Sequence, residues 1–264
     1  METEAVLELL TRVSAEVVEP RFRALSDDEV HEKRPGDPVT VADREAEVLL
    51  TRALRSAWPD AVVLGEEAYA GDPSLMQQYA TAEHAFTVDP VDGTNNFIRG
   101  SADHAMMLAE VLRGEVVRSW TWHPQHRVSY VAERGAGAWR NGERLERAPA
   151  TTQPVGRTSN RAWAKLPWGE LSPLQRTWFS CGVDYPRLVE GEADFLLYRG
   201  QTSTSHRGMP WDHAPGSLLV TETGGVVCAF DGEPYHPQRL PTRGLLVAAD
   251  PATADLVLGQ LGDL

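Results

Sequence analysis

Two short apolar runs in this sequence end directly on acidic residues. Residues 61–64 run into Gly65-Glu66-Glu67, and residues 85–88 run into Asp89. Apolar runs of this length, bounded by turn-forming or polar residues, predict buried strands. If both strands belong to one sheet, their acidic ends lie at the same end of that sheet. The feature therefore favours a fold that gathers carboxylates at one sheet edge.

The segments before these runs predict helices. Apolar residues recur at helical spacing from Val6 to Val17 and stop before Pro20, which indicates an amphipathic first helix. Residues 33–38 read as a loop. A second helix is expected from Asp43 toward Trp58, with Asp43 at its N-terminus.

The remainder of the chain alternates strand-like and helical segments. Residues 105–112, 115–122 and 127–133 are joined by short turns and predict an antiparallel meander. From about Arg157 the expected elements are shorter: a piece over 185–190, strands at 195–198, 226–230 and 245–249, and helices at 212–222 and 252–261. The class is α+β. A weak change of pattern near Ala150 suggests an N-terminal half, 1–150, and a C-terminal half, 151–264, packed as one unit.

Composition limits the classes of partner. A net charge of −13 disfavours nucleic acids and anionic membranes, because such a partner would approach a surface of its own sign. No run of about 18 apolar residues and no secretory signal are found, so we expect a soluble, cytoplasmic protein. Cys181 and Cys228 have no metal-ligand spacing and are expected to be thiols that fill apolar space. A small anionic metabolite remains possible if the carboxylates collect divalent cations first.

The stretch Asp89-Pro90-Val91-Asp92-Gly93-Thr94 has the composition of a magnesium site. Mg²⁺ prefers a few closely placed oxygen ligands, and Asp89, Asp92 and the carbonyl of Val91 offer them. Gly93 lets the backbone turn and present the N–H groups of Gly93 and Thr94 to an anion. The same residues also form ordinary turns, and this stretch alone does not separate the two readings. A calcium loop is excluded because its sixth and twelfth positions would be Thr94 and Gly100.

Other acids have ordinary explanations when taken singly. Glu66 and Glu67 read as a solvated turn, Asp212 as the cap of a helix, and Asp43 with Thr40 as another cap.

Taken together, four blocks resemble the inositol monophosphatase family of magnesium-dependent, lithium-sensitive phosphatases. The blocks are Asp37-Pro38-Val39-Thr40-Val41-Ala42-Asp43, Gly65-Glu66-Glu67, Asp89-Pro90-Val91-Asp92-Gly93-Thr94-Asn95-Asn96-Phe97, and Trp211-Asp212 with Glu222-Thr223-Gly224-Gly225. The resemblance extends from about residue 6 to the C-terminus. It implies a layered α-β-α-β-α fold, a homodimer, and Mg²⁺-dependent hydrolysis of a small phosphate monoester with two to three ions per site.

The resemblance also implies residue roles. Glu66, Asp89 and the Val91 carbonyl would hold one ion, Asp89, Asp92 and Asp212 a second, and Glu66 a weaker third. Thr94, backed by Asp43, would polarise the attacking water, because a hydroxyl alone is a poor base. Substrate contacts would come from Asp92, Gly93, Thr94, Gly182, Asp184 and Asp212.

Departures from the family pattern leave the leaving group open. Gly182-Val183-Asp184 stands where the family has G-[ST]-A, so an acid replaces alanine. The glutamate that grips an inositol hydroxyl has no counterpart in residues 201–208, a polar loop or surface turn in which His206 and Arg207 could attract a second anion. An inositol or polyol phosphate is the first expectation, with histidinol phosphate and a 3′-phosphonucleotide as alternatives. An alternative of another class is a catalytically silent metal-binding scaffold.

Overall fold

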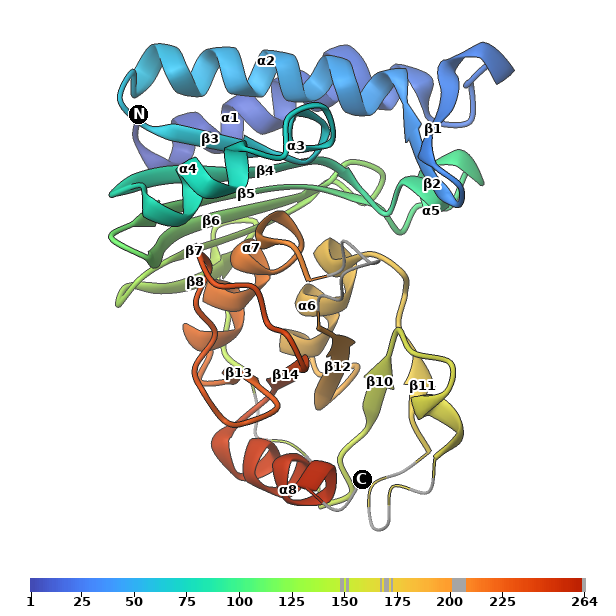
Figure 1. Ribbon diagram of the computed structural model, residues 1–264, viewed down its shortest axis with the longest axis vertical. Helices are drawn as coiled ribbons and strands as arrows, with labels where there is room; N and C mark the ends of the chain where they lie inside the picture. The colour runs from blue at the N-terminus through green and yellow to red at the C-terminus, as the bar shows by residue number, and fades with distance from the viewer. Residues whose placement is uncertain are drawn as a thin grey trace.

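Helices and sheets alternate in five layers (Figure 1). The computed structural model describes residues 1–147, 150, 152–166, 168, 171, 173–200 and 208–262. Helices α1 (Thr3–Val13) and α2 (Val41–Ala57) form the first layer, α6 (Cys181–Val189) and α7 (Pro210–Thr221) the middle one, and α8 (Pro251–Gly262) the last. A sheet lies between each pair of helix layers. The expected α-β-α-β-α arrangement is confirmed.

The first sheet has seven strands in the order β3-β4-β5-β6-β7-β8-β9. Their bounds are β3 (Val62–Gly65), β4 (His84–Asp92), β5 (Ala105–Leu112), β6 (Glu115–His123), β7 (Val128–Glu133), β8 (Gly137–Arg140) and β9 (Glu143–Arg144). Strands β3 and β4 pair in parallel, with Gly65 opposite Val88, and the remaining neighbours are antiparallel. The expected meander is present, and the two acid-terminated runs do end at the same edge.

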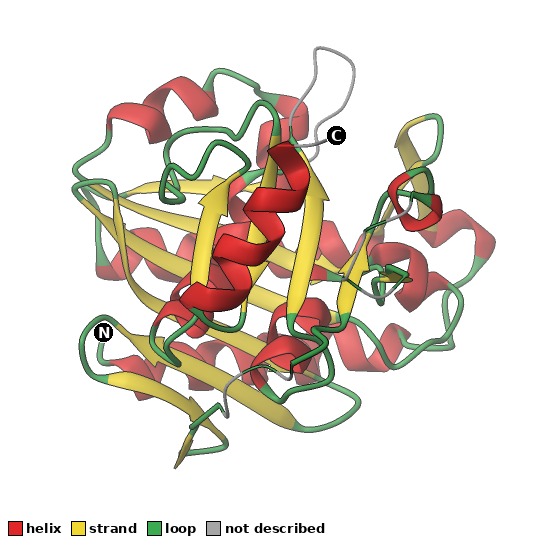
Figure 2. Ribbon diagram, turned by 90° about the horizontal axis from the view of Figure 1, so that it is seen from below, coloured by secondary structure: helices red, strands yellow, loops and turns green. Residues whose placement is uncertain are grey.

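The second sheet has five strands in the order β11-β10-β12-β14-β13 (Figure 2). Their bounds are β10 (Gly156–Thr158), β11 (Gln175–Arg176), β12 (Phe195–Arg199), β13 (Val226–Ala229) and β14 (Gly244–Ala248). Strand β10 is parallel to both β11 and β12, whereas β14 is antiparallel to β12 and β13. The carboxyl ends of β10, β11 and β12 therefore share one edge.

Apolar side chains fill each space between layers. Leu10, Leu50 and Phe86 belong to the core between the first helices and the first sheet. Along β12, Leu196 faces the core that includes α6 and α7, while Phe195 and Leu197 face the core beneath α8. This alternation follows from the two-residue period of a strand and explains why β12 reads as a continuous apolar run.

Two expectations about the first fifty residues were wrong. Residues 33–38 are not a loop but part of a hairpin, β1 (Val30–Arg34) and β2 (Asp37–Thr40), which turns at Gly36 with φ +79°. Strand β1 is largely exposed and so carries no apolar alternation. The first helix does not stop before Pro20: it widens into a π-helical turn, Ser14–Val18, and a 3₁₀ turn, Glu19–Arg21. Pro20 is the second residue of this 3₁₀ turn, a position whose N–H the turn itself does not use.

Short helices complete the chain: 3₁₀ turns at Asp27–Glu29 and Trp163–Lys165, and helices α3 (Glu66–Gly71), α4 (Leu75–Thr81) and α5 (Thr94–Ile98). Among the helices of the described residues, none has both the length and the apolar character that a membrane crossing requires.

Candidate metal centre

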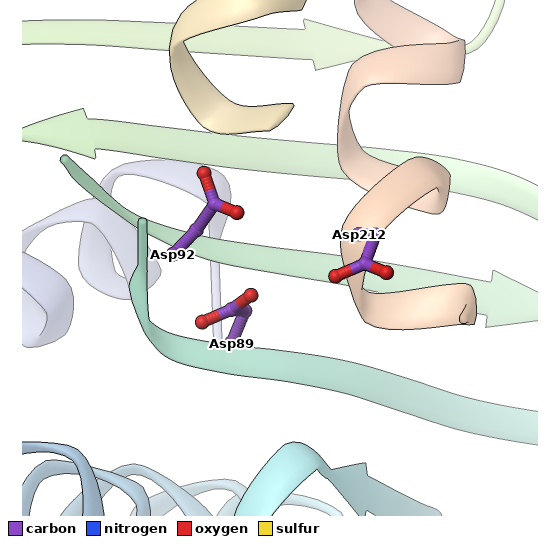
Figure 3. A group of neighbouring side chains, drawn as sticks. All are labelled: Asp89, Asp92 and Asp212. Atoms are coloured by element: carbon purple, nitrogen blue, oxygen red, sulfur yellow. The ribbon is translucent and has the colours of Figure 1, made fainter. Parts of the chain in front are cut away.

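Three aspartates from two elements meet in the space between the first sheet and α7. One carboxylate oxygen from each of Asp89, Asp92 and Asp212 lies within 4.8 Å of the others. Figure 3 shows the three carboxylates turned toward a shared space. Asp89 and Asp92 belong to the last part of β4, and Asp212 to the first turn of α7.

Local backbone features aim these side chains. The pairing of β4 with β5 shifts register between Asp89 and Asp92, so the strand bends where the acids lie. Gly93 then takes a left-handed conformation with φ +83° and caps α5. A Cβ at this position would lie 2.9 Å from the Cβ of Ser180, so the turn needs glycine on two counts.

Asp212 combines two roles. The expected N-cap position is wrong: Met209 is the N-cap of α7, and Asp212, the third residue of the helix, accepts a hydrogen bond of 3.2 Å from the Met209 N–H at its Oδ2. Its carboxylate nevertheless takes part in the three-aspartate group. A capping residue can therefore also face a ligand, because a carboxylate accepts several hydrogen bonds or metal contacts.

The charges of this group repel one another. Burial raises the pKa of Asp89 well above its usual value, and the charges of Glu66, Asp92 and Asp212 raise it further. Burial and the charges of Glu66 and Asp92 likewise raise the pKa of Asp212. In the described residues Asp89 Oδ1 is buried and accepts no hydrogen bond. A buried carboxylate oxygen without a donor, beside two carboxylates that repel it, forms a donor set that suits divalent cations, which prefer oxygen ligands.

Glu66 lies beside the group but is held by a lysine. It opens α3 directly after β3, and the Nζ of Lys33 on the β1–β2 hairpin lies 2.6 Å from Glu66 Oε1 and 2.8 Å from Glu67 Oε1. Glu66 is outside the group of three whose oxygens lie within 4.8 Å. Its charge still raises the pKa values of all three aspartates.

Glu47 of α2 fixes the start of α3, a role that no local sequence pattern indicates. Its carboxylate accepts hydrogen bonds from the N–H groups of Glu67, at 2.8 Å, and Ala68, at 2.7 Å. Gly65 lies against it so closely that a Cβ there would be 2.2 Å from Glu47 Cδ. Glu47 looks like any polar residue of an amphipathic helix, and only its contacts reveal the role.

Thr94 and Asp43 are brought together across 51 residues. Thr94 Oγ1 lies 3.2 Å from Asp43 Oδ1 and 3.1 Å from the carbonyl oxygen of Val91. Asp43 Oδ2 accepts hydrogen bonds from the N–H and hydroxyl groups of Thr40, which complete a capping box on α2. Burial raises the pKa of Asp43 to about 7, assisted by the charges of Glu67 and Glu66 and opposed by Thr40.

The N-terminal end of α6, with its N-cap Ser180, contacts Asp92. The N–H of Gly182 donates a 2.7 Å hydrogen bond to Asp92 Oδ2, and the hydroxyl of Ser180 donates to the same oxygen. Burial raises the pKa of Asp92 to about 6, although these hydrogen bonds oppose the shift. Ser180 was not expected in the site, since a single serine before a helix resembles a cap.

Asp184 lies deeper than expected for a residue that contacts substrate. It is 1% exposed, and its two oxygens accept hydrogen bonds of 2.8 Å from Trp178 N–H and from the Tyr198 hydroxyl. Burial raises its pKa to about 7. Asp184 and Tyr198 also line a cavity of about 630 Å³ that reaches Asp92, Thr94 and Asp212. Residues 201–207, including His206 and Arg207, lie outside the described residues; Gly208 lines the cavity.

Comparisons with known proteins identify related sequences and a related fold. The sequence model of the inositol monophosphatase family matches residues 2–263. Nus factor SuhB of Escherichia coli is 28% identical over 249 residues, which cover 89% of this chain and 86% of that protein. Fructose-1,6-bisphosphatase/inositol-1-monophosphatase of Thermotoga maritima is 28% identical over 210 residues, 76% of each. A solved IMPase/NADP phosphatase complexed with Mg²⁺ and phosphate superposes with a TM-score of 0.77 at 20% identity, covering 96% of this chain and 91% of that one.

Proposed function

Since the chain belongs to the inositol monophosphatase family, we propose that it hydrolyses a small phosphate monoester with the help of Mg²⁺. The observation that carries the proposal is the group Asp89, Asp92 and Asp212, of which the first two are buried and Asp89 Oδ1 has no hydrogen-bond donor among the described residues. Clustered carboxylates raise the free energy of the fold unless a cation binds, so this group supports a cation site, and the Thr94–Asp43 pair beside it supports hydrolysis over a silent metal-binding scaffold.

The donor atoms divide naturally into overlapping sets. Asp89 would serve two ions: one with Glu66 and the carbonyl of Val91, the other with Asp92 and Asp212. A third ion would need Glu66 to exchange Lys33 for the metal. When bound there, Mg²⁺ lowers the pKa of water and neutralises charge on the phosphoryl oxygens.

Thr94 and Asp43 would orient the attacking water. The Thr94 hydroxyl can donate its one proton to Asp43 Oδ1, which leaves the Oγ1 lone pairs free to accept a hydrogen bond from water. Asp43 would then be placed to accept the proton that the water releases through Thr94. The N–H groups of Gly93 and Thr94, at the start of α5, would donate to a phosphate oxygen.

The leaving group would lie toward Gly182 and Asp184. Each oxygen of Asp184 already accepts one hydrogen bond and has a second lone pair for a substrate hydroxyl or amine. An inositol or polyol phosphate is our first candidate, and histidinol phosphate and a 3′-phosphonucleotide are the alternatives. Lithium sensitivity, a homodimer and a cytoplasmic location remain predictions.

The test is phosphate release from inositol 1-phosphate, histidinol phosphate and adenosine 3′,5′-bisphosphate, with and without Mg²⁺ and with added Li⁺. We expect turnover that requires Mg²⁺ and falls by at least about a thousandfold in Asp89→Asn, a loss typical of removing central electrostatic stabilisation. Asp60→Asn, on the exposed surface, is the matched control. Tight Mg²⁺ binding without hydrolysis of any ester would favour the scaffold instead.

A further inference from the structure

A proline inside α6 deprives one carbonyl of its usual donor. In an α-helix the carbonyl oxygen of Gly182 would accept from the N–H group four residues later, but that residue is Pro186, which has no N–H. Gly182 is buried, so its carbonyl needs a donor from elsewhere in the protein. His123, the last residue of β6, supplies it: its Nε2 lies 2.7 Å from the Gly182 carbonyl oxygen. The first sheet thus provides a hydrogen bond that the helix cannot make.

His123 is held in the fold as a neutral donor. The residue is 6% exposed, and its ring centre lies 5.2 Å from that of Tyr130 on the neighbouring strand β7. Burial lowers the pKa of His123 to about 4, although the contact with Gly182 opposes the shift. A neutral imidazole has one N–H, and a carbonyl oxygen can only accept, so the proton is on Nε2. That single N–H is therefore committed to Gly182.

Gly182 holds the Asp92 carboxylate with its other backbone group. Its N–H belongs to the first turn of α6, where N–H groups have no partner inside the helix, and it donates to Asp92 Oδ2 at 2.7 Å. The Ser180 hydroxyl donates to the same oxygen. Since a carboxylate is planar, these bonds set the direction of both its oxygens. Asp92 is one of the three acids whose oxygens gather within 4.8 Å, so His123 reaches this group through one intervening residue.

The two ends of α6 are tied to the first sheet by separate contacts. At the N-terminal end, a Cβ on Gly182 would lie 2.6 Å from the Cβ of Ala105 on β5, so the helix lies directly on the sheet there. At the C-terminal end, the Tyr130 hydroxyl donates to Glu190 Oε1 at 2.7 Å. The contact from His123 therefore acts on the end of α6 that holds Asp92.

We propose that His123 is a positioning residue for the metal centre. It ties the first turn of α6 to the end of β6 and thereby fixes the Asp92 carboxylate in the direction that a divalent cation requires. This inference rests on the function proposed above, in which Asp92 is a metal ligand. Groups that orient a metal ligand from behind contribute to metal affinity because they remove the cost of ordering the ligand when the ion binds.

The test is the affinity for Mg²⁺, measured by calorimetry at a temperature at which every variant is folded. His123→Leu removes the donor and should weaken Mg²⁺ binding about 10-fold, the smaller of the losses typical when a group behind a metal ligand is removed. The Mg²⁺ concentration for half-maximal phosphate release should rise by the same factor, whereas kcat at saturating Mg²⁺ should change by less than about threefold. His123→Gln keeps an N–H donor and should bind Mg²⁺ within about threefold of the parent.

Tyr130→Phe is the matched control, because it removes a hydrogen bond from the other end of the same helix. It should lower stability without changing the affinity for Mg²⁺. Parental affinity in His123→Leu, or an equal loss of affinity in Tyr130→Phe, would overturn the positioning role and leave the phosphatase function intact.

Pro186→Ala separates the positioning of Asp92 from the mere satisfaction of the Gly182 carbonyl. The alanine N–H can restore the helical hydrogen bond, so His123→Leu should cost less stability in this background, which also serves if the single variant does not fold. Relative to Pro186→Ala alone, the double variant should still bind Mg²⁺ about 10-fold more weakly, because its helix end is no longer tied to β6. Equal affinity of these two variants would refute the proposal.

The same measurements separate this inference from the phosphatase function. If the parent binds Mg²⁺ and hydrolyses no ester, the phosphatase function fails, and the affinities of the variants still decide the role of His123. If the parent binds no divalent cation, both proposals fail, since Asp92 then has no ion to hold.

Discussion

Replacing Lys33 by methionine tests how the charges of the metal centre are balanced. The ammonium group contacts Glu66 at 2.6 Å and Glu67 at 2.8 Å, and the side chains are 9%, 21% and 9% exposed, respectively. Burial alone lowers the pKa of Lys33, but the two glutamates outweigh it and raise the pKa overall. The lysine is therefore charged, and it neutralises two neighbouring acids.

The cost of removing this charge can be worked from its burial. Breaking a largely buried ion pair from one side costs about 3–5 kcal/mol, because the remaining charge is uncompensated. For a chain of this size that corresponds to a fall in Tm of roughly 5–10 °C without metal. Mg²⁺ that binds Glu66 replaces the missing positive charge, so saturating Mg²⁺ should restore part of the lost stability.

The assay is thermal unfolding of Lys33→Met and of the parent protein across a Mg²⁺ titration. Lys165→Met, the same change at the chain's other lysine, which is exposed, should match the parent throughout. If Glu66 is a ligand, the variant should also need roughly 10- to 50-fold less Mg²⁺ for half-maximal stabilisation. In the parent, Mg²⁺ must displace Lys33 from Glu66, and that contact accounts for about half of the ion-pair energy given above. A Tm gap that Mg²⁺ does not narrow would refute the reasoning.

Three further changes probe the same region. Asp89→Asn removes one of three repelling charges, so in a thermal scan at pH 8 the metal-free variant should melt above the parent and gain no stability from Mg²⁺. Gly65→Ala should lower the free energy of unfolding in urea by about 2–4 kcal/mol, because its Cβ would displace the Glu47 carboxylate, whereas Gly71→Ala has open space and serves as control. Asp184 has a pKa of about 7 when folded against 3.8 when unfolded. The folded state thus binds its proton more tightly, and unfolding free energy should fall by roughly 4 kcal/mol between about pH 4 and pH 7, a fall that Asp184→Asn removes in urea titrations at each pH.

Each of these has a clear contrary outcome. A metal-free Asp89→Asn protein that melts below the parent would mean that its carboxylate is satisfied within the fold. Equal losses for Gly65→Ala and Gly71→Ala would show that the contact with Glu47 does not set the cost at Gly65. A parallel pH dependence of Asp184→Asn and parent would place the titration on another group.

The strands and turns that hold the acidic residues could be predicted from the sequence, because each is set by a short local segment. The apolar runs before Glu66 and Asp89 had to be buried strands, and parallel pairing of β3 with β4 then put their ends at one edge. Gly93 after Asp92 signalled a turn, and φ +83° confirms it. The reading of residues 33–38 as a loop failed because an exposed hairpin has no apolar periodicity. Because these residues were expected to form a loop, the position of Lys33 could not be predicted; the hairpin places it against Glu66.

Residues that form hydrogen bonds with distant parts of the chain could not be predicted from local patterns. Glu47 resembles an ordinary helix residue, and its two hydrogen bonds reach across 20 and 21 positions. Ser180 reaches Asp92 across 88 positions. No local pattern records such contacts, because hydrogen bonding depends on distance in space and not along the chain.

The sequence by itself determined the elements and the order of the acids that form the metal centre, since strand burial, glycine turns and helix caps are local effects. Only the tertiary structure decided how charges are shared among them. In the folded chain Lys33 forms an ion pair with Glu66, and Asp184 is buried with a hydrogen bond from Tyr198. The ends of β10, β11 and β12 are aligned, so arginines at these ends line one cavity. Electrostatic energies depend on separation and burial, and both are set when the five layers pack.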